Sequence, residues 1–157
     1  MGALIIILPS NHPDIEEFIN CKNDLTKVLK ANISIMVDDD FMNAVIKDST
    51  YKLSFYVEQT GELIEKTVKA KTLFRQLAEN AWNYAEPGIL YKGAIDRYNL
   101  MSNVEEYKIT GSNPCGEIPM PSMSACLLGS INLSEYVINP YTKLAEFDFG
   151  KLEDDIP

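Results

Sequence analysis

Cations and histidine are scarce in this chain of 157 residues. It has 14 lysines and arginines against 23 aspartates and glutamates, a single histidine and a net charge of −9. No basic patch or stripe is present, which argues against binding to a nucleic-acid polymer. The one histidine, His12, has no second ligand at metal spacing, so we interpret it as a residue near a helix start.

Long hydrophobic runs and a disulfide framework are also missing. The apolar stretch at residues 3–8 ends at Pro9 and is too short to span a bilayer, and it lacks the basic leader of a signal peptide. Three cysteines, an odd number, argue against a secreted disulfide scaffold. We therefore expect a cytoplasmic protein without membrane segments, in which thiols stay reduced unless they turn over.

What the chain does have is a cysteine between an amide and a carboxylate. Residues 113–117 read Asn-Pro-Cys-Gly-Glu and are called here the Cys115 segment. In an extended strand, alternate side chains point to the same side. We therefore expect Asn113, Cys115 and Glu117 to face one small volume together. Pro114 and Gly116 would keep the intervening positions stiff and slim.

The surroundings of Cys115 do not favour an ordinary thiolate nucleophile. His12 is far away in the sequence, and a neighbouring carboxylate raises the pKa of a thiol. A thiol that donates and accepts a hydrogen atom needs no low pKa. A second thiol, Cys126, follows in residues 124–133, Ser-Ala-Cys-Leu-Leu-Gly-Ser-Ile-Asn-Leu, called here the Cys126 segment.

Together the two segments resemble the active-site sequences of the ribonucleotide reductase large (catalytic) subunit. The Pro-Cys-Gly form is most similar to the adenosylcobalamin-dependent class, whereas Leu127 departs from the asparagine that is usual after the second cysteine. By this resemblance, the fold is part of a ten-stranded α/β barrel that is incomplete in this chain. Residues 1–157 would be a central fragment of the catalytic barrel domain, with its finger loop at residues 111–133.

The resemblance also implies the chemistry, which is the reduction of ribonucleotides to 2′-deoxyribonucleotides for DNA synthesis. Cys115 would become a thiyl radical that removes the 3′-hydrogen of the ribose. Glu117 would take the proton of the 3′-hydroxyl, and Asn113 would hydrogen-bond the sugar hydroxyls. The substrate would be contacted by all five residues of the segment: Asn113, Pro114, Cys115, Gly116 and Glu117.

The same resemblance implies a reductant, a cofactor and partners. Cys126 would be one of the reducing cysteine pair, whose other member matches a position upstream of this chain's first residue. An external dithiol of the thioredoxin kind would restore the pair. The expected radical source is adenosylcobalamin, and the alternative is a tyrosyl radical from a separate di-iron small subunit. The expected partners are a ribonucleotide substrate, a nucleotide effector, and the rest of the reductase chain or a second copy in a homodimer.

Residues 23–30 match the loop that carries the signal between effector nucleotide and substrate base in that family. The match lies between His-Pro-Asp-Ile at residues 12–15 and Asn-Ile-Ser-Ile at residues 32–35. The glycine usual in this loop is missing, and a solvated connection is the other interpretation. The candidate effector-loop residues are Asn23, Asp24, Lys27 and Lys30, the two lysines as phosphate or base contacts.

Hydrophobic periodicity predicts buried strands alternating with amphipathic helices, which is an α/β class. The expected strands are 3–8 (buried on both faces), 32–37 (period two), 51–57, 63–68 and 89–91, and the expected helices are 13–22, 41–46 and 71–84. Residues 38–40, three aspartates, are expected to cap a helix rather than to bind a metal. Trp82 is expected in the core, and Asp96 and Arg97 to pair with each other or with nearby backbone.

Two other functions stay open on the sequence alone. One is a non-catalytic fragment that must complement another chain, because a partial barrel exposes unpaired strand edges. Expressed alone, such a piece would be inactive and poorly soluble or oligomeric. The other is a thiol–disulfide protein using Cys115 and Cys126, which lack Cys-x-x-Cys spacing and an activating cation nearby. Cys21 is expected to be a half-buried spectator, and a redox partner of Cys126 only within disulfide reach.

Overall fold

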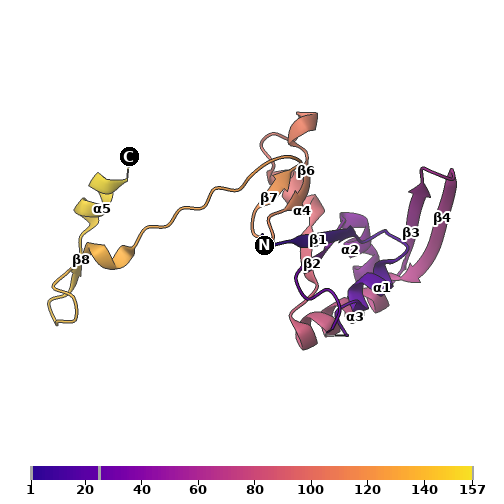
Figure 1. Cartoon of the computed structure of the whole chain (residues 1–157), viewed down its shortest axis with the longest axis horizontal. Coiled ribbons are helices and arrows are strands. Elements are labelled where there is room, and N and C mark those ends of the chain that lie inside the picture. Colours follow the sequence, from indigo (N-terminus) through magenta and orange to yellow (C-terminus); the bar gives the residue numbers. More distant parts are fainter. Residues whose placement is uncertain (1, 25, 157) are drawn as a thin grey trace. The chain divides into compact units, whose positions relative to one another are not determined.

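The computed structural model describes residues 2–24 and 26–156. It separates into two compact units, Met1–Cys126 and Leu127–Pro157 (Figure 1). Each unit has its own secondary structure and its own buried residues, so each is described by itself. No helix among the described residues is both long enough and apolar enough to cross a membrane.

The first unit is built on a three-stranded parallel sheet in the order β1-β2-β5. Helices α1, α2 and α3 and the β3–β4 hairpin lie between these strands in the sequence, and α4 follows β5. The bounds are β1 Ile5–Pro9, α1 Ile15–Asn20, β2 Asn32–Val37, α2 Asp39–Ile46, β3 Thr50–Val57, β4 Glu62–Lys69, α3 Ala70–Tyr84, β5 Gly88–Tyr91 and α4 Lys92–Tyr98. The predicted α/β class is therefore confirmed.

The two faces of this sheet have different neighbours. Strand register puts Leu8, Ile35 and Ile89 side by side, and all three belong to the core or pack against it. That core is completed by residues of α1 and α3, among them Ile15 and Leu77. Because side chains alternate along a strand, the intervening residues of β1, β2 and β5 point to the face away from these helices.

Burial in the sheet differs from the prediction for β1 and β2. Strand β1 was expected to be buried on both faces, but it lies at the edge of the sheet and Ile6 is 42% exposed. The central strand, β2, takes that role instead, since Ile33, Ser34 and Ile35 are all buried. The apolar run of β1 looks the same as that of a central strand, because composition does not encode strand order.

Several local predictions are confirmed. Asp38 caps α2, since its Oδ1 accepts a hydrogen bond from the Phe41 backbone N–H at 2.6 Å. The expected hairpin is present as β3 and β4, which pair antiparallel throughout. His12 lies beside the start of α1, where its Nδ1 accepts from the Asp14 N–H at 3.1 Å.

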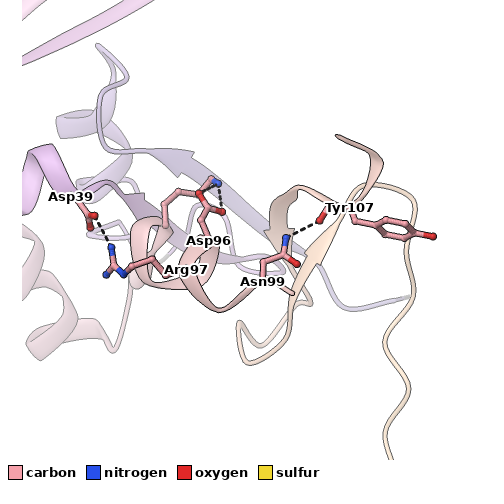
Figure 2. A network of polar contacts seen from close by, with 6 residues as sticks. Asp39, Asp96, Arg97, Asn99 and Tyr107 are labelled. Carbon is pink, nitrogen blue, oxygen red and sulfur yellow. Dashed lines mark hydrogen bonds and ion pairs between the residues drawn. The ribbon is translucent and has the colours of Figure 1, made fainter. Parts of the chain in front are cut away.

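Two predictions about side chains are wrong. Trp82 is 89% exposed, whereas Asn80 on the same helix is buried and donates to the Ile19 carbonyl at 3.2 Å. Asp96 pairs with Lys92, and Arg97 reaches Asp39 at 2.8 Å (Figure 2). Helical spacing puts Lys92 and Asp96 one turn apart on α4, a helix that the sequence did not predict.

The second unit has a small aromatic core. It contains the short helix η2 (Leu133–Tyr136), the strand pair β8 (Val137–Ile138) and β9 (Glu146–Phe147), and α5 (Phe149–Asp155). Tyr136 is buried, with its ring 6.1 Å from that of Phe147 and the Lys151 ammonium 4.2 Å from its centroid. Burial raises the pKa of the Tyr136 hydroxyl, and the Asp155 carboxylate raises it further.

Candidate active site

The Cys115 segment connects two short antiparallel strands, β6 (Ile109–Ser112) and β7 (Pro119–Pro121). It is a tight turn, because the Gly116 N–H donates to the Asn113 carbonyl at 2.9 Å and Gly116 has a φ of +86°. The extended arrangement expected from alternation is therefore wrong. Asparagine first, proline second and glycine fourth are the residue preferences of a type I turn, and that signal was present in the sequence.

Asn113 organises this turn from inside. It is only 4% exposed, and its Oδ1 accepts from the Ile118 N–H at 3.0 Å and from the Ser112 hydroxyl at 3.2 Å. Its Nδ2 donates to the Glu117 carboxylate. The amide and the carboxylate therefore do meet, as the sequence predicted, but they meet across a turn rather than along a strand.

Cys115 lies at the third position of the turn, between the amide and the carboxylate. Both Cys115 and Glu117 are exposed, whereas Asn113 is buried. The buried Asn113 amide thus binds the Glu117 carboxylate, while the Cys115 sulfur stays accessible. The thiol and the carboxylate are thus both open to a ligand from outside.

The turn is attached to the parallel sheet by a hydrogen bond from β2. Asn32 Nδ2 donates to the Pro114 carbonyl at 2.7 Å. A Cβ on Gly116 would lie 4.0 Å from Leu90 of β5, and one on Gly111 would lie 3.7 Å from Ile7 of β1. All three sheet residues belong to the face directed away from the core helices, by the strand register.

Figure 1 agrees with this placement, since β6 and β7 lie on the other side of β1 and β2 from α1 and α3. Sequence reasoning did not identify Asn32 as a site residue. A polar residue at a strand start has many uses, so no local signal pointed to this contact.

An apolar cavity of about 590 Å³ lies beside the hairpin that carries the turn. Ile109 and Pro119 line it from the hairpin, and Ile95 and Tyr98 line it from α4. Cys115 is not among its lining residues. The cavity flanks the base of the hairpin rather than enclosing the sulfur.

The Cys126 segment has no helix or strand before Leu133. Cys126 is half-buried, and Leu127 and Leu128 are 94% and 78% exposed. All three cysteines of the chain are free thiols, Cys21 among them, half-buried at the end of α1. Burial raises the pKa of the Cys21 thiol, against an opposing effect of Lys22.

The whole chain, residues 1–157, matches the family described as the ribonucleotide reductase barrel domain. The chain belongs to this family. The predicted resemblance and the α/β barrel assignment are thereby confirmed, and the three parallel strands are an incomplete part of such a barrel.

Curated relatives within the reductase family are similar along almost the whole chain. A vitamin B12-dependent ribonucleoside-diphosphate reductase of Thermoplasma acidophilum is 38% identical over 156 residues, covering 99% of this chain and 19% of that protein. A vitamin B12-dependent ribonucleotide reductase of Streptomyces clavuligerus is 36% identical over 170 residues, covering 94% and 17%. A vitamin B12-dependent ribonucleoside-diphosphate reductase of Mycobacterium tuberculosis is 30% identical over 154 residues, covering 98% and 20%. The chain thus spans about a fifth of the length of these reductases.

Residues 23–30, which the resemblance predicts to be an effector loop, are turns and bends wherever the structure describes them. Leu25, within it, lies outside the described residues. Asn23 donates to the Asn20 side chain at 3.1 Å, and Lys27 lies 3.4 Å from Asp24 in an ion pair. Asn23, Asp24 and Lys27 therefore make only short-range contacts on this exposed loop.

Two of these residues differ in what surrounds them. Hydrogen bonds from the Thr26 hydroxyl and backbone N–H lower the pKa of Asp24. Lys30 lines a cavity of about 430 Å³ together with Thr26 and Leu29. Lys30 is thus the one lysine among the described residues at the edge of this cavity.

Proposed function

We propose that this chain is the central segment of the catalytic barrel of a vitamin B12-dependent ribonucleotide reductase, with its finger loop at residues 111–133. The reaction would be the radical reduction of ribonucleotides to 2′-deoxyribonucleotides. The observation that carries the proposal is the buried Asn113 amide, which binds the Glu117 carboxylate on a tight turn whose Cys115 thiol is exposed. Family membership and the names of the relatives support it.

Each residue of the Cys115 segment has a role in the proposed reaction. The Cys115 sulfur, as a thiyl radical, takes the 3′-hydrogen atom, which forms the S–H bond and leaves a carbon radical at C3′. Glu117 takes the proton of the 3′-hydroxyl, and the 2′-hydroxyl leaves as water after it accepts a proton from the thiol pair that supplies the two electrons. Cys115 finally returns its hydrogen atom to C3′, which restores the thiyl radical, and Glu117 returns its proton. Asn113 orients Glu117 and hydrogen-bonds the sugar hydroxyls. Pro114 and Gly116 fix the shape of the turn that contacts the substrate.

Glu117 suits the role of a general base because it is positioned without being buried. A base placed within hydrogen-bond reach of the proton it removes typically contributes ~10²–10⁴-fold to the rate. The hydrogen bond from Asn113 Nδ2 limits the conformational freedom of the Glu117 carboxylate before the substrate binds. Such orientation is a large part of the catalytic effect of a positioned group.

The two electrons for the reduction come from a pair of thiols that becomes a disulfide. We propose Cys126 as one member, paired with a cysteine outside residues 1–157. An external dithiol of the thioredoxin kind then reduces that disulfide. The half-buried Cys126 lies on a stretch without helix or strand, which suits a residue that must meet a second sulfur and then a reductant.

The cofactor fits this chain only in part. Adenosylcobalamin, when bound, supplies the radical chemistry that activates the Cys115 thiol, and the exposure of Cys115 leaves that thiol accessible. The turn around Cys115 does not enclose a corrin ring, so we assign no residue of this chain to the cofactor's contacts. The relatives' names favour cobalamin over a di-iron subunit as the radical source.

The proposed partners follow from the same assignment. They are a ribonucleotide substrate at the Cys115 segment, a nucleotide effector near Asn23, Asp24, Lys27 and Lys30, and the remaining barrel strands or a second copy. The free edge of β1 and the exposure of Ile6 on that strand support a need for further strands.

The test is complementation. The chain is mixed with the remaining segments of a related B12-dependent reductase, adenosylcobalamin and a dithiol, and deoxyribonucleotide formation is measured. We expect Cys115→Ser to abolish turnover and Cys126→Ser to abolish turnover driven by the external dithiol, while the matched control Cys21→Ser stays active. Activity that is indifferent to Cys115→Ser would overturn the catalytic proposal and leave a structural, complementing role.

A further inference from the structure

A half-buried ion pair lies at the base of the loop formed by residues 23–30. Lys22 follows the end of α1, and Glu86 precedes β5, 64 residues later. Their side chains are only 15% and 22% exposed, in contrast to pairs such as Lys66–Glu16 at 48% and 45%. A shielded pair of this kind is more sensitive to loss of one partner than an exposed pair.

Both members of the pair also bind the backbone at the other end of the loop. Lys22 Nζ donates to the Ala31 carbonyl at 2.6 Å, and Glu86 Oε1 accepts from the Ile33 N–H at 3.0 Å. Lys22 directly precedes the loop and Ala31 directly follows it. One ammonium therefore joins the two ends of the loop.

Asn32, the residue between these two contacts, points to the Cys115 segment. Its Nδ2 donates to the Pro114 carbonyl at 2.7 Å, on the peptide that joins Pro114 to Cys115. Ala31 and Ile33 are buried, whereas Asn32 is exposed, and alternation along β2 puts the Asn32 side chain on the opposite face of the sheet from Ile33. The ion pair thus binds the backbone on both sides of Asn32, the residue that hydrogen-bonds the Cys115 turn.

We propose that Lys22 and Glu86 are positioning residues that couple the loop at residues 23–30 to the Cys115 turn through Asn32. Rearrangement of the loop then changes where Ala31 and Ile33 lie, and with them the hydrogen bond on the Pro114 carbonyl. The physical coupling stands on the contacts alone. Its importance for catalysis rests on the proposed function.

The test is a double-mutant cycle read by hydrogen exchange, which needs no activity. In the complemented assembly, exchange of the Asn113 and Gly116 amides is compared in Lys22→Met, Asn32→Ala and the double variant. We expect each single change to speed exchange by roughly fivefold or more, and the double variant to add little, because the two changes break one chain of contacts. Lys22→Arg should restore slow exchange, and Lys66→Met, which breaks the exposed pair, should have no effect.

Two results would overturn the coupling. One is a Lys22→Met variant in which the loop amides exchange faster while those of Asn113 and Gly116 do not change. The other is full additivity of Lys22→Met and Asn32→Ala. Amides of α3 serve as the folding check, and if they also lose protection, Glu86→Gln replaces Lys22→Met and is judged by the same two results.

Turnover in the same assembly separates this proposal from the proposed function. If hydrogen exchange shows no coupling while turnover still depends on Cys115, only the positioning role is refuted. Coupling by hydrogen exchange, in an assembly whose turnover ignores Cys115→Ser, refutes only the proposed reaction.

Discussion

The Cys115 and Cys126 segments carry the two sulfurs of one proposed reaction, yet they are held very differently. The Cys115 segment is closed by its own hydrogen bonds and tied to β2 through Asn32. The Cys126 segment has no helix or strand before Leu133, and its leucines are exposed. Two equally clear sequence motifs can thus differ in how much of their geometry is set by residues within the motif itself. A turn needs only a few local bonds, whereas an irregular stretch is shaped by whatever packs against it.

The largest expected difference between the two segments comes from their asparagines. Asn113→Ala removes a buried acceptor and leaves the Ile118 N–H without its side-chain partner, so we expect a loss of about 1–3 kcal/mol in the free energy of opening the turn. Hydrogen exchange of the backbone amides of β6 and of Met120 in β7 measures it.

Asn132→Ala in the Cys126 segment is the matched control. Asn132 is exposed and its Oδ1 accepts from the Ser134 N–H at 3.3 Å, so its loss as a cap should cost about 1 kcal/mol or less. Equal costs at both positions would contradict the contrast between the segments.

The two glycines give a smaller effect of the same kind. Gly116 has a φ of +86°, a backbone conformation that disfavours a side chain, so Gly116→Ala should destabilise the turn by about 1–2 kcal/mol. Gly129 in the Cys126 segment has open space around it, and Gly129→Ala should change stability by less than about 0.5 kcal/mol. Chemical denaturation of the two variants beside the parent chain measures both values. A neutral Gly116→Ala would mean that the turn is not held in this conformation.

The smallest expected effect concerns the cores of the two units and is seen only at alkaline pH. Burial and the hydrogen bond to Asp38 raise the pKa of Tyr51, whose hydroxyl donates to that carboxylate at 2.8 Å. The folded chain therefore keeps a proton that the unfolded chain releases near pH ~10, so this part of the stability is present below that pH and is lost as pH rises further. Phenolate absorbance and the free energy of unfolding, followed together against pH, measure it.

Tyr51→Phe is the control for that pH dependence. In this variant the free energy of unfolding should no longer fall at alkaline pH by the part that belongs to Tyr51. The part that belongs to Tyr136 in the second unit, whose pKa is also raised, should remain. A pH profile identical to that of the parent would show that Tyr51 is not the group responsible.

The elements that the sequence predicted well are those with strong local signals. The Asp38 cap, the β3–β4 hairpin and the long helix α3 each depend on residues close together in the chain. The wrong predictions for Trp82 and Arg97 concern what lies on the far side of an element. Trp82 on α3 faces away from the core, and Arg97 pairs with Asp39 across 58 residues of sequence.

For the candidate site, the sequence alone determined the chemistry on offer: a thiol, an amide and a carboxylate within five residues, and a second thiol shortly after. It also determined the family, because residue identity and order carry that information without any coordinates. Only the tertiary structure decided that Asn113 is the buried centre of the turn, and that Asn32 links the turn to the loop base held by Lys22 and Glu86. The physical reason is that a hydrogen bond between residues far apart in the chain exists only after strand pairing brings them together, and nothing in the local sequence of either partner specifies the other.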